Sequence, residues 1–230
     1  MSIRVGLFDS GVGGLTVFKK VAKLYPHFSF IYLADTARIP YGSKNRNEIR
    51  KIAKEIVSWF DLQNIDVLLV ACNTTNSIAL DVIKNNLNIP VFGLIESVSL
   101  LLEDGRVGVL ATPSTVKSNA YTKAILDFNP KAFVLEQACP EFVSNIEVDD
   151  INLDKLRTLA IEYLTPLLKA EVESIILGCS HYPLIIPLLS ELIPSKVNLI
   201  DPAIALSFKL ESFSGARIID PTKTDYQIQT

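Results

Sequence analysis

DVLLVACNTTN (66–76) and ESIILGCSHYP (173–183) are the two stretches that decide the fold. Each begins with a short apolar run typical of a buried strand, followed by a small residue, a cysteine and polar residues. The two cysteines, Cys72 and Cys179, stand about half the chain length apart. The similarity indicates two similar half-domains that each present a thiol at the end of a central strand. Coincidence is the alternative, because buried strands often end in small residues.

Other apolar runs of strand length surround these two stretches. Between them lie helix-like segments, such as the one from Asn45 to Leu62, which carries its apolar residues on one face. Alternating strands and helices predict an α/β fold of parallel sheets with helices on both faces and ligands at the carboxyl ends of the strands. The other predicted strands are IRVGLF (3–8), FSFIYLA (28–34), PVFGL (90–94), RVGVLA (106–111), AFVLEQA (132–138) and VNLID (197–201).

The composition argues against several classes of protein. Hydrophobic residues make up 49% of the 230 residues, and the net charge is −3 with scattered basic residues, so no nucleic-acid partner is expected. No apolar run reaches the roughly 20 residues of a membrane span, and no signal-peptide pattern is present. Three widely spaced cysteines and two histidines predict neither a disulfide framework nor a metal site, and they favour a reducing cytoplasm.

DSGVGG (9–14) follows the first predicted strand and is a candidate for binding an anion. Its glycines would let backbone N–H groups at a helix start approach a negative charge. Thr16 stands where a dinucleotide-binding fingerprint has its third glycine, and the Lys-Ser/Thr pair of a nucleotide-binding phosphate loop is missing. The alternative is a tight turn in which Asp9 and Ser10 merely cap the helix.

Cys72 and Cys179 are the candidate reactive groups. Each is expected between a strand and a helix N-terminus, where the helix dipole lowers the pKa of a thiol and nearby N–H groups and hydroxyls could hold a carboxylate. His181, two residues from Cys179, could tune or relay its proton. A single buried cysteine is usually inert, and this is our interpretation of Cys139, whose neighbours are not similarly polar.

Five segments carry a resemblance to a known family. They are DSGVGGLTV (9–17), ADTARIPYG (34–42), ACNTTN (71–76), CPEFVSNIE (139–147) and GCSHYP (178–183). In these segments, which span most of the chain, the sequence resembles the glutamate racemase family. The resemblance implies a cytoplasmic homodimer that racemises glutamate without cofactor or metal and supplies D-glutamate for peptidoglycan synthesis.

The resemblance also implies roles for individual residues. Cys72 and Cys179 become the catalytic bases, with Asp9, Glu147 and His181 as auxiliary acid/base groups. The implied fold has two similar α/β domains, each a mainly parallel sheet flanked by helices, with the active site in the cleft between them. The first comprises residues 1–95 and 206–230, and the second residues 96–205. The implied substrate contacts are Asp9, Ser10, Tyr41, Gly42, Asn73, Thr74, Ser180 and His181.

The sequence departs from the family pattern at several places. Thr is usual where Ser180 stands, a small residue where Thr75 stands, and Leu and Pro where Glu141 and Ser144 stand. Ser180 keeps a hydroxyl, so we expect carboxylate binding to survive. The C-terminal end is shorter than usual in the family, so the resemblance says less about the last helix and the dimer contacts. The first predicted strand begins almost at Met1, so we expect no N-terminal extension that would support activation by a cell-wall precursor.

Inverting an α-carbon needs a base on one face and an acid on the other, and two opposed thiols supply both. Three other functions stay open. One is a related two-cysteine racemase acting on aspartate, a hydantoin or another small acid. The second is a thiol hydrolase with Cys179 as nucleophile and His181 as base, which leaves Cys72 unexplained. The third is a binding module without catalysis, which leaves the matched motifs unexplained.

Overall fold

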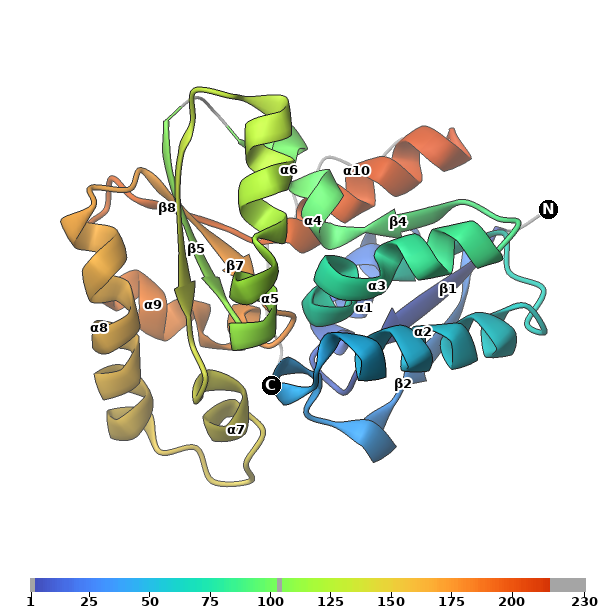
Figure 1. Ribbon diagram of the computed structural model, residues 1–230, viewed down its shortest axis with the longest axis horizontal. Helices are drawn as coiled ribbons and strands as arrows, with labels where there is room; N and C mark the ends of the chain where they lie inside the picture. Colours follow the sequence, from blue (N-terminus) through green and yellow to red (C-terminus); the bar gives the residue numbers. More distant parts are fainter. Residues whose placement is uncertain (1–2, 103–104, 216–230) are drawn as a thin grey trace.

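The computed structural model describes residues 3–102 and 105–215. Its strands form two separate four-stranded parallel sheets, one in each of the two lobes that Figure 1 shows side by side. All eight predicted strands are confirmed to within two residues at each end. The first sheet holds β1 (Arg4–Asp9), β2 (Ser29–Ala34), β3 (Val67–Val70) and β4 (Val91–Gly93), and the second β5 (Arg106–Ala111), β6 (Phe133–Ala138), β7 (Ser174–Gly178) and β8 (Asn198–Ile200).

The two sheets have the same topology, which confirms the internal repeat. The strand order is β2-β1-β3-β4 in the first and β6-β5-β7-β8 in the second, with every neighbouring pair parallel. β3 and β7 therefore occupy equivalent inner positions. Cys72 comes two residues after β3, and Cys179 comes directly after β7. The two thiols thus leave their sheets at equivalent places.

Helices cover both faces of each sheet, as the alternating pattern predicts. The helix predicted from Asn45 begins with Asn45 as its cap: the Asn45 side chain accepts from the Glu48 N–H, and the Glu48 side chain accepts from the Asn45 N–H. The helices are α1 (Leu15–Leu24), α2 (Arg46–Phe60), α3 (Asn73–Asn86), α4 (Leu94–Ser97), α5 (Pro113–Ser118), α6 (Ala120–Phe128), α7 (Phe142–Ile146), α8 (Leu153–Lys169), α9 (Ile186–Leu192) and α10 (Pro202–Ser214); short 3-10 turns are η1 (Thr36–Arg38), η2 (Tyr41–Ser43), η3 (Val98–Leu101) and η4 (Tyr182–Ile185).

The first sheet separates two apolar clusters because alternate strand residues point to opposite faces. Phe8 and Val70 pack against α2 and α3, whereas Leu7 and Leu69 pack against α1 and α10. In the second lobe, α8 and α9 cover one face of the sheet, and α6 with the segment around α4 and η3 covers the other.

Helix α10 returns from the second lobe to the first (Figure 1). Its residues Ala203, Leu206 and Leu210 belong to the cluster of the first sheet. Part of the predicted first domain, residues 216–230, lies outside the described residues, and the domain boundaries stay a prediction. Throughout the described ranges, every helix is too short or too polar to cross a lipid bilayer.

Candidate active site

A pocket of about 470 Å³ opens between the lobes. Its lining includes residues that follow the carboxyl ends of β1 and β3 in the first lobe and of β5, β6 and β7 in the second. This is the expected place for a ligand in parallel α/β folds. The predicted site residues that line it are Ser10, Tyr41, Gly42, Cys72, Asn73, Thr74, Glu147, Cys179, Ser180 and His181. Asp9 is fully buried and does not line it.

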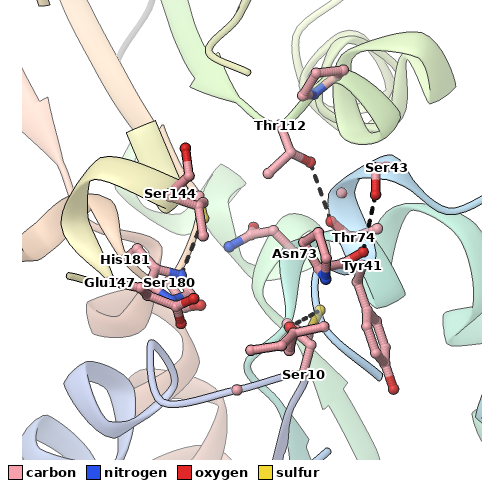
Figure 2. A pocket seen from close by; sticks show the side chains of 18 of the residues that line it. Ser10, Tyr41, Ser43, Asn73, Thr74, Thr112, Ser144, Glu147, Ser180 and His181 are labelled. Atoms are coloured by element: carbon pink, nitrogen blue, oxygen red, sulfur yellow. Dashed lines mark hydrogen bonds and ion pairs between the residues drawn. The ribbon is translucent and has the colours of Figure 1, made fainter. Parts of the chain in front are cut away.

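Cys72 is held at the start of α3. It is the N-cap residue of that helix, and its Sγ accepts from the Thr75 N–H at 3.4 Å. Ser10, which follows β1, places its Oγ 3.5 Å from the same sulfur (Figure 2). Only 3% of Cys72 is exposed. The predicted position between a strand and a helix N-terminus is therefore confirmed for this thiol.

Cys179 lies in a different local structure from the one we expected. The segment after β7 turns into the 3-10 helix η4, so no α-helix N-terminus adjoins this thiol. Tyr182 and Pro183 begin η4, and the chain becomes α-helical at Ile186. The Cys179 Sγ instead lies 3.6 Å from Nδ1 of His181. The prediction of a helix dipole at Cys179 was wrong because local spacing does not distinguish a 3-10 turn from a longer helix.

His181 joins Cys179 to a carboxylate. Its Nε2 lies 2.6 Å from Oε1 of Glu147, while its Nδ1 faces the Cys179 sulfur. Glu147 follows the short helix α7, and Figure 2 shows the two side chains against each other at one wall of the pocket. This arrangement of carboxylate, imidazole and thiol can orient the ring and move a proton to or from the sulfur.

Burial dominates the electrostatics of both thiols. It raises the pKa of Cys72, and the nearby Asp9 raises it further, while the contacts from Ser10 and Thr75 lower it in part. Burial likewise raises the pKa of Cys179. The expectation that a helix start lowers both thiol pKa values was therefore wrong in direction, because removing a thiolate from water outweighs the local N–H groups.

Asp9 organises the glycine loop that follows it. Its Oδ2 accepts from the N–H groups of Gly11 at 3.2 Å and Gly14 at 2.8 Å. The N-cap of α1 is Gly14, so Asp9 and Ser10 do not cap that helix. These N–H groups hold the carboxylate of Asp9 rather than an external anion, which corrects the anion-site prediction. Burial raises the pKa of the Asp9 carboxyl, and His181 with these N–H groups lowers it in part.

The glycine loop and the first turn of α1 also contact the Cys179 segment of the other lobe. The Thr16 hydroxyl donates to the Ser180 carbonyl at 2.8 Å, and the Ser180 hydroxyl donates to Asp9 at 3.3 Å. A Cβ at Gly13 would lie 2.4 Å from the His181 ring and 2.7 Å from the Ser180 hydroxyl. Gly13 is therefore needed for the close approach of the two segments.

Comparison with known proteins places these features in one family. The model of the family described as Asp/Glu/Hydantoin racemase matches residues 15–207. A glutamate racemase of Prochlorococcus marinus (strain NATL2A) is 62% identical over 96% of this chain and 83% of its own length. The chain belongs to the glutamate racemase family. A glutamate racemase of Synechococcus sp. (strain CC9605) is 50% identical over 90% of this chain and 78% of its own length.

Solved members of the glutamate racemase family share this fold. The glutamate racemase of Francisella tularensis, solved in complex with D-glutamate, is 38% identical, with a TM-score of 0.86 over 92% of this chain and 81% of its own. A glutamate racemase isoform of Bacillus anthracis has a TM-score of 0.87 at 30% identity over the same shares. The aspartate racemase of Picrophilus torridus, at 21% identity and a TM-score of 0.67, is similar in fold alone.

The sequence did not indicate several residues that line the pocket, among them Thr112 and Cys139, which follow strands of the second lobe. Thr112 directly follows β5, and its hydroxyl lies 3.2 Å from that of Thr74 in the other lobe (Figure 2). Cys139 directly follows β6 and lines the same pocket, although we interpreted it as an inert core residue. The strand-end position that indicated Cys72 and Cys179 was the signal that could have found both. Within the described part of the chain, no three His, Cys, Asp or Glu side chains are grouped to hold a metal ion.

Proposed function

We propose that this protein interconverts L- and D-glutamate without a cofactor, using Cys72 and Cys179 as its two bases. The observation that carries the proposal is that both thiols line one pocket from equivalent strands of opposite lobes. A substrate held between them has one thiol available to each face of its α-carbon. The 62% identity to a glutamate racemase supports glutamate as the substrate.

The reaction needs one thiolate and one thiol. The thiolate takes the α-proton, so the Cα–H bond breaks, an S–H bond forms and the electron pair stays on the substrate. The opposite thiol then gives its proton to the other face of the same carbon and becomes a thiolate. Each turnover exchanges the states of the two sulfurs. We assign abstraction from D-glutamate to Cys72 and from L-glutamate to Cys179, following the family resemblance.

Burial gives the pocket two properties that suit this chemistry. A thiolate removed from water is a stronger base, and burial raises the pKa of both thiols. A pocket from which water is excluded also strengthens hydrogen bonds to the negative charge that develops on the substrate. Direct substrate contacts are proposed from Ser10, Tyr41, Gly42, Asn73, Thr74, Ser180 and His181, which line the pocket. Asp9, the remaining predicted contact, is fully buried and is proposed to act on the substrate through Ser180.

Asp9, Glu147 and His181 are proposed as auxiliary acid/base groups. Glu147→Gln and His181→Asn are each expected to slow turnover about 10²-fold without abolishing it, because both leave the thiols in place but weaken control of the Cys179 proton. Asp9→Asn is expected to have a similar effect through Ser180 and the glycine loop. Steady-state kcat in both directions measures these effects, with melting temperature as the control for folding. Wild-type kcat in all three variants would remove the auxiliary role.

The cellular setting is proposed from the same resemblance. We propose a cytoplasmic homodimer that supplies D-glutamate for peptidoglycan synthesis. We also propose that each protomer divides into a domain of residues 1–95 and 206–230 and a domain of residues 96–205. The packing of Leu206 and Leu210 against the first sheet supports the return of the chain to the first domain.

Circular dichroism of L-glutamate incubated with the purified protein tests the proposed function. In buffer without pyridoxal phosphate, nucleotide or metal, the signal is expected to decay to zero, because only a racemase equalises the two enantiomers. L-aspartate in a parallel cuvette distinguishes a related racemase, and a thiol hydrolase using Cys179 and His181 would leave the signal of both amino acids unchanged. A constant glutamate signal, or decay that requires an added cofactor, would contradict the proposal.

A further inference from the structure

Tyr121 has no part in the chemistry described above, yet it contacts both cysteine motifs. It is the second residue of α6 in the second lobe and is fully buried. Its ring packs on Gly178, the residue before Cys179, where an added Cβ would lie 3.0 Å from the ring carbon Cε2. Its hydroxyl donates to Oδ1 of Asn73, the residue after Cys72, at 2.6 Å. Tyr121 therefore joins the two halves of the site.

The hydrogen bond from Tyr121 sets the direction of the Asn73 amide. A separation of 2.6 Å is typical of O–H···O bonds and shorter than N–H···O bonds, so the amide oxygen faces the tyrosine. Burial raises the pKa of the Tyr121 hydroxyl well above its ordinary value, so the hydroxyl keeps its proton and stays a donor. The amide nitrogen must then point the other way.

The Asn73 amide nitrogen lacks an acceptor at this site. Asn73 lines the pocket with 3% of its surface exposed, and its buried Nδ2 finds no hydrogen-bond partner among the described residues. In Figure 2 the side chain lies between Tyr41 and Thr74 on one side and His181 and Glu147 on the other. Buried polar groups in native proteins are nearly always paired, which indicates that a ligand supplies the acceptor.

We propose that Tyr121 is a positioning residue that holds the Asn73 amide so that its Nδ2 donates to a carboxylate oxygen of the substrate. The inference rests on the proposed function, because glutamate brings the carboxylates that accept this bond. Without the hydroxyl, the amide is free to turn its oxygen toward the pocket. An amide oxygen facing a carboxylate repels it, so substrate binding weakens.

Tyr121→Phe tests this directly, because it keeps the ring on Gly178 and removes the hydroxyl alone. KM for both enantiomers is expected to rise about tenfold, the order expected for losing one hydrogen bond to a charged group, while kcat changes much less. The matched control is Tyr25→Phe. Tyr25 is also fully buried, and its hydroxyl donates to the Ser207 carbonyl at 2.9 Å, away from the pocket lining. In Tyr25→Phe the melting temperature is expected to fall by about as much as in Tyr121→Phe, while KM is expected to stay at the wild-type value.

Two further variants separate positioning from packing. Asn73→Ala alone is expected to raise KM, and adding Tyr121→Phe to it is expected to raise KM no further, because the tyrosine acts through the amide. Asn73→Asp is expected to raise KM above that of Asn73→Ala, because a carboxylate then faces the substrate. The comparison of Asn73→Asp with Asn73→Ala tests whether the amide donates to the substrate even if Tyr121→Phe does not fold.

The outcomes are distinguishable from failure of the proposed function. If wild-type protein does not racemise glutamate, the proposed function fails and the inference fails with it. If wild-type protein is active, three results overturn the inference alone: a wild-type KM in Tyr121→Phe, independent effects of Tyr121→Phe and Asn73→Ala, or tighter substrate binding by Asn73→Asp than by Asn73→Ala.

Discussion

Cys72→Ala and Cys179→Ala are each expected to lower racemisation in both directions by about 10⁴-fold, the upper end of what a positioned acid or base contributes. Every turnover uses one sulfur to remove a proton and the other to return one, so losing either blocks L-to-D and D-to-L conversion alike. Neither variant is expected to unfold, because each substitution removes a single sulfur atom. Initial rates from each enantiomer, with melting temperatures, measure both expectations.

Cys139→Ala is the matched control for the two cysteine variants. Cys139 is a buried thiol that lines the same pocket, but its Sγ contacts the Gln137 carbonyl at 3.6 Å and it packs in the apolar cluster of the second lobe. Cys139 is neither of the two proposed bases, so its loss is expected to leave the rate in both directions largely unchanged. A control variant as inactive as Cys72→Ala would mean that pocket shape, rather than the two bases, explains the losses.

Gly13→Ala is expected to reduce kcat at least about 10²-fold and to lower the free energy of unfolding by about 1–3 kcal/mol. The added methyl would lie 2.4 Å from the His181 ring and 2.7 Å from the Ser180 hydroxyl, and both residues are buried with little room to move. Relief of this overlap displaces the segment that carries Cys179. Turnover and chemical denaturation of the variant measure the two effects.

Gly11→Ala provides a control within the same loop. A Cβ at Gly11 would lie 3.5 Å from Glu147 and from Ile39, which is ordinary van der Waals contact. Neither Gly11 nor Gly13 has a positive φ angle, so both changes are free of backbone strain and differ in the space available. Equal losses in the two variants would contradict the role assigned to the close approach at Gly13.

Much of the fold could be predicted because its signals are local. Each strand is a short apolar run, and the cap at Asn45 needs one partner three residues away. The repeat was visible because Cys72 and Cys179 follow equivalent strands with similar neighbours. Parallel sheets then direct both thiols to the carboxyl ends of their strands, where the pocket lies.

The remaining features depend on contacts between residues far apart in the chain. No local pattern shows that Gly13 makes room for His181, or that Tyr121 reaches Asn73 across the lobes. The predicted direction of the Cys72 pKa shift was wrong for the same reason. Spacing predicted the nearby N–H groups, but the depth of burial that outweighs them is a property of the packed fold.

Hydrogen exchange at the α-carbon tests the central claim most directly, because it follows the two proposed bases in a single experiment. Protein equilibrated in D₂O is given protiated L-glutamate, and both enantiomers are recovered early in the reaction. If two opposed thiols exchange protons with the two faces, the D-glutamate formed carries solvent deuterium while the recovered L-glutamate stays largely protiated. Deuterium appearing in recovered substrate as early as in product would instead indicate a single shared base and contradict the account.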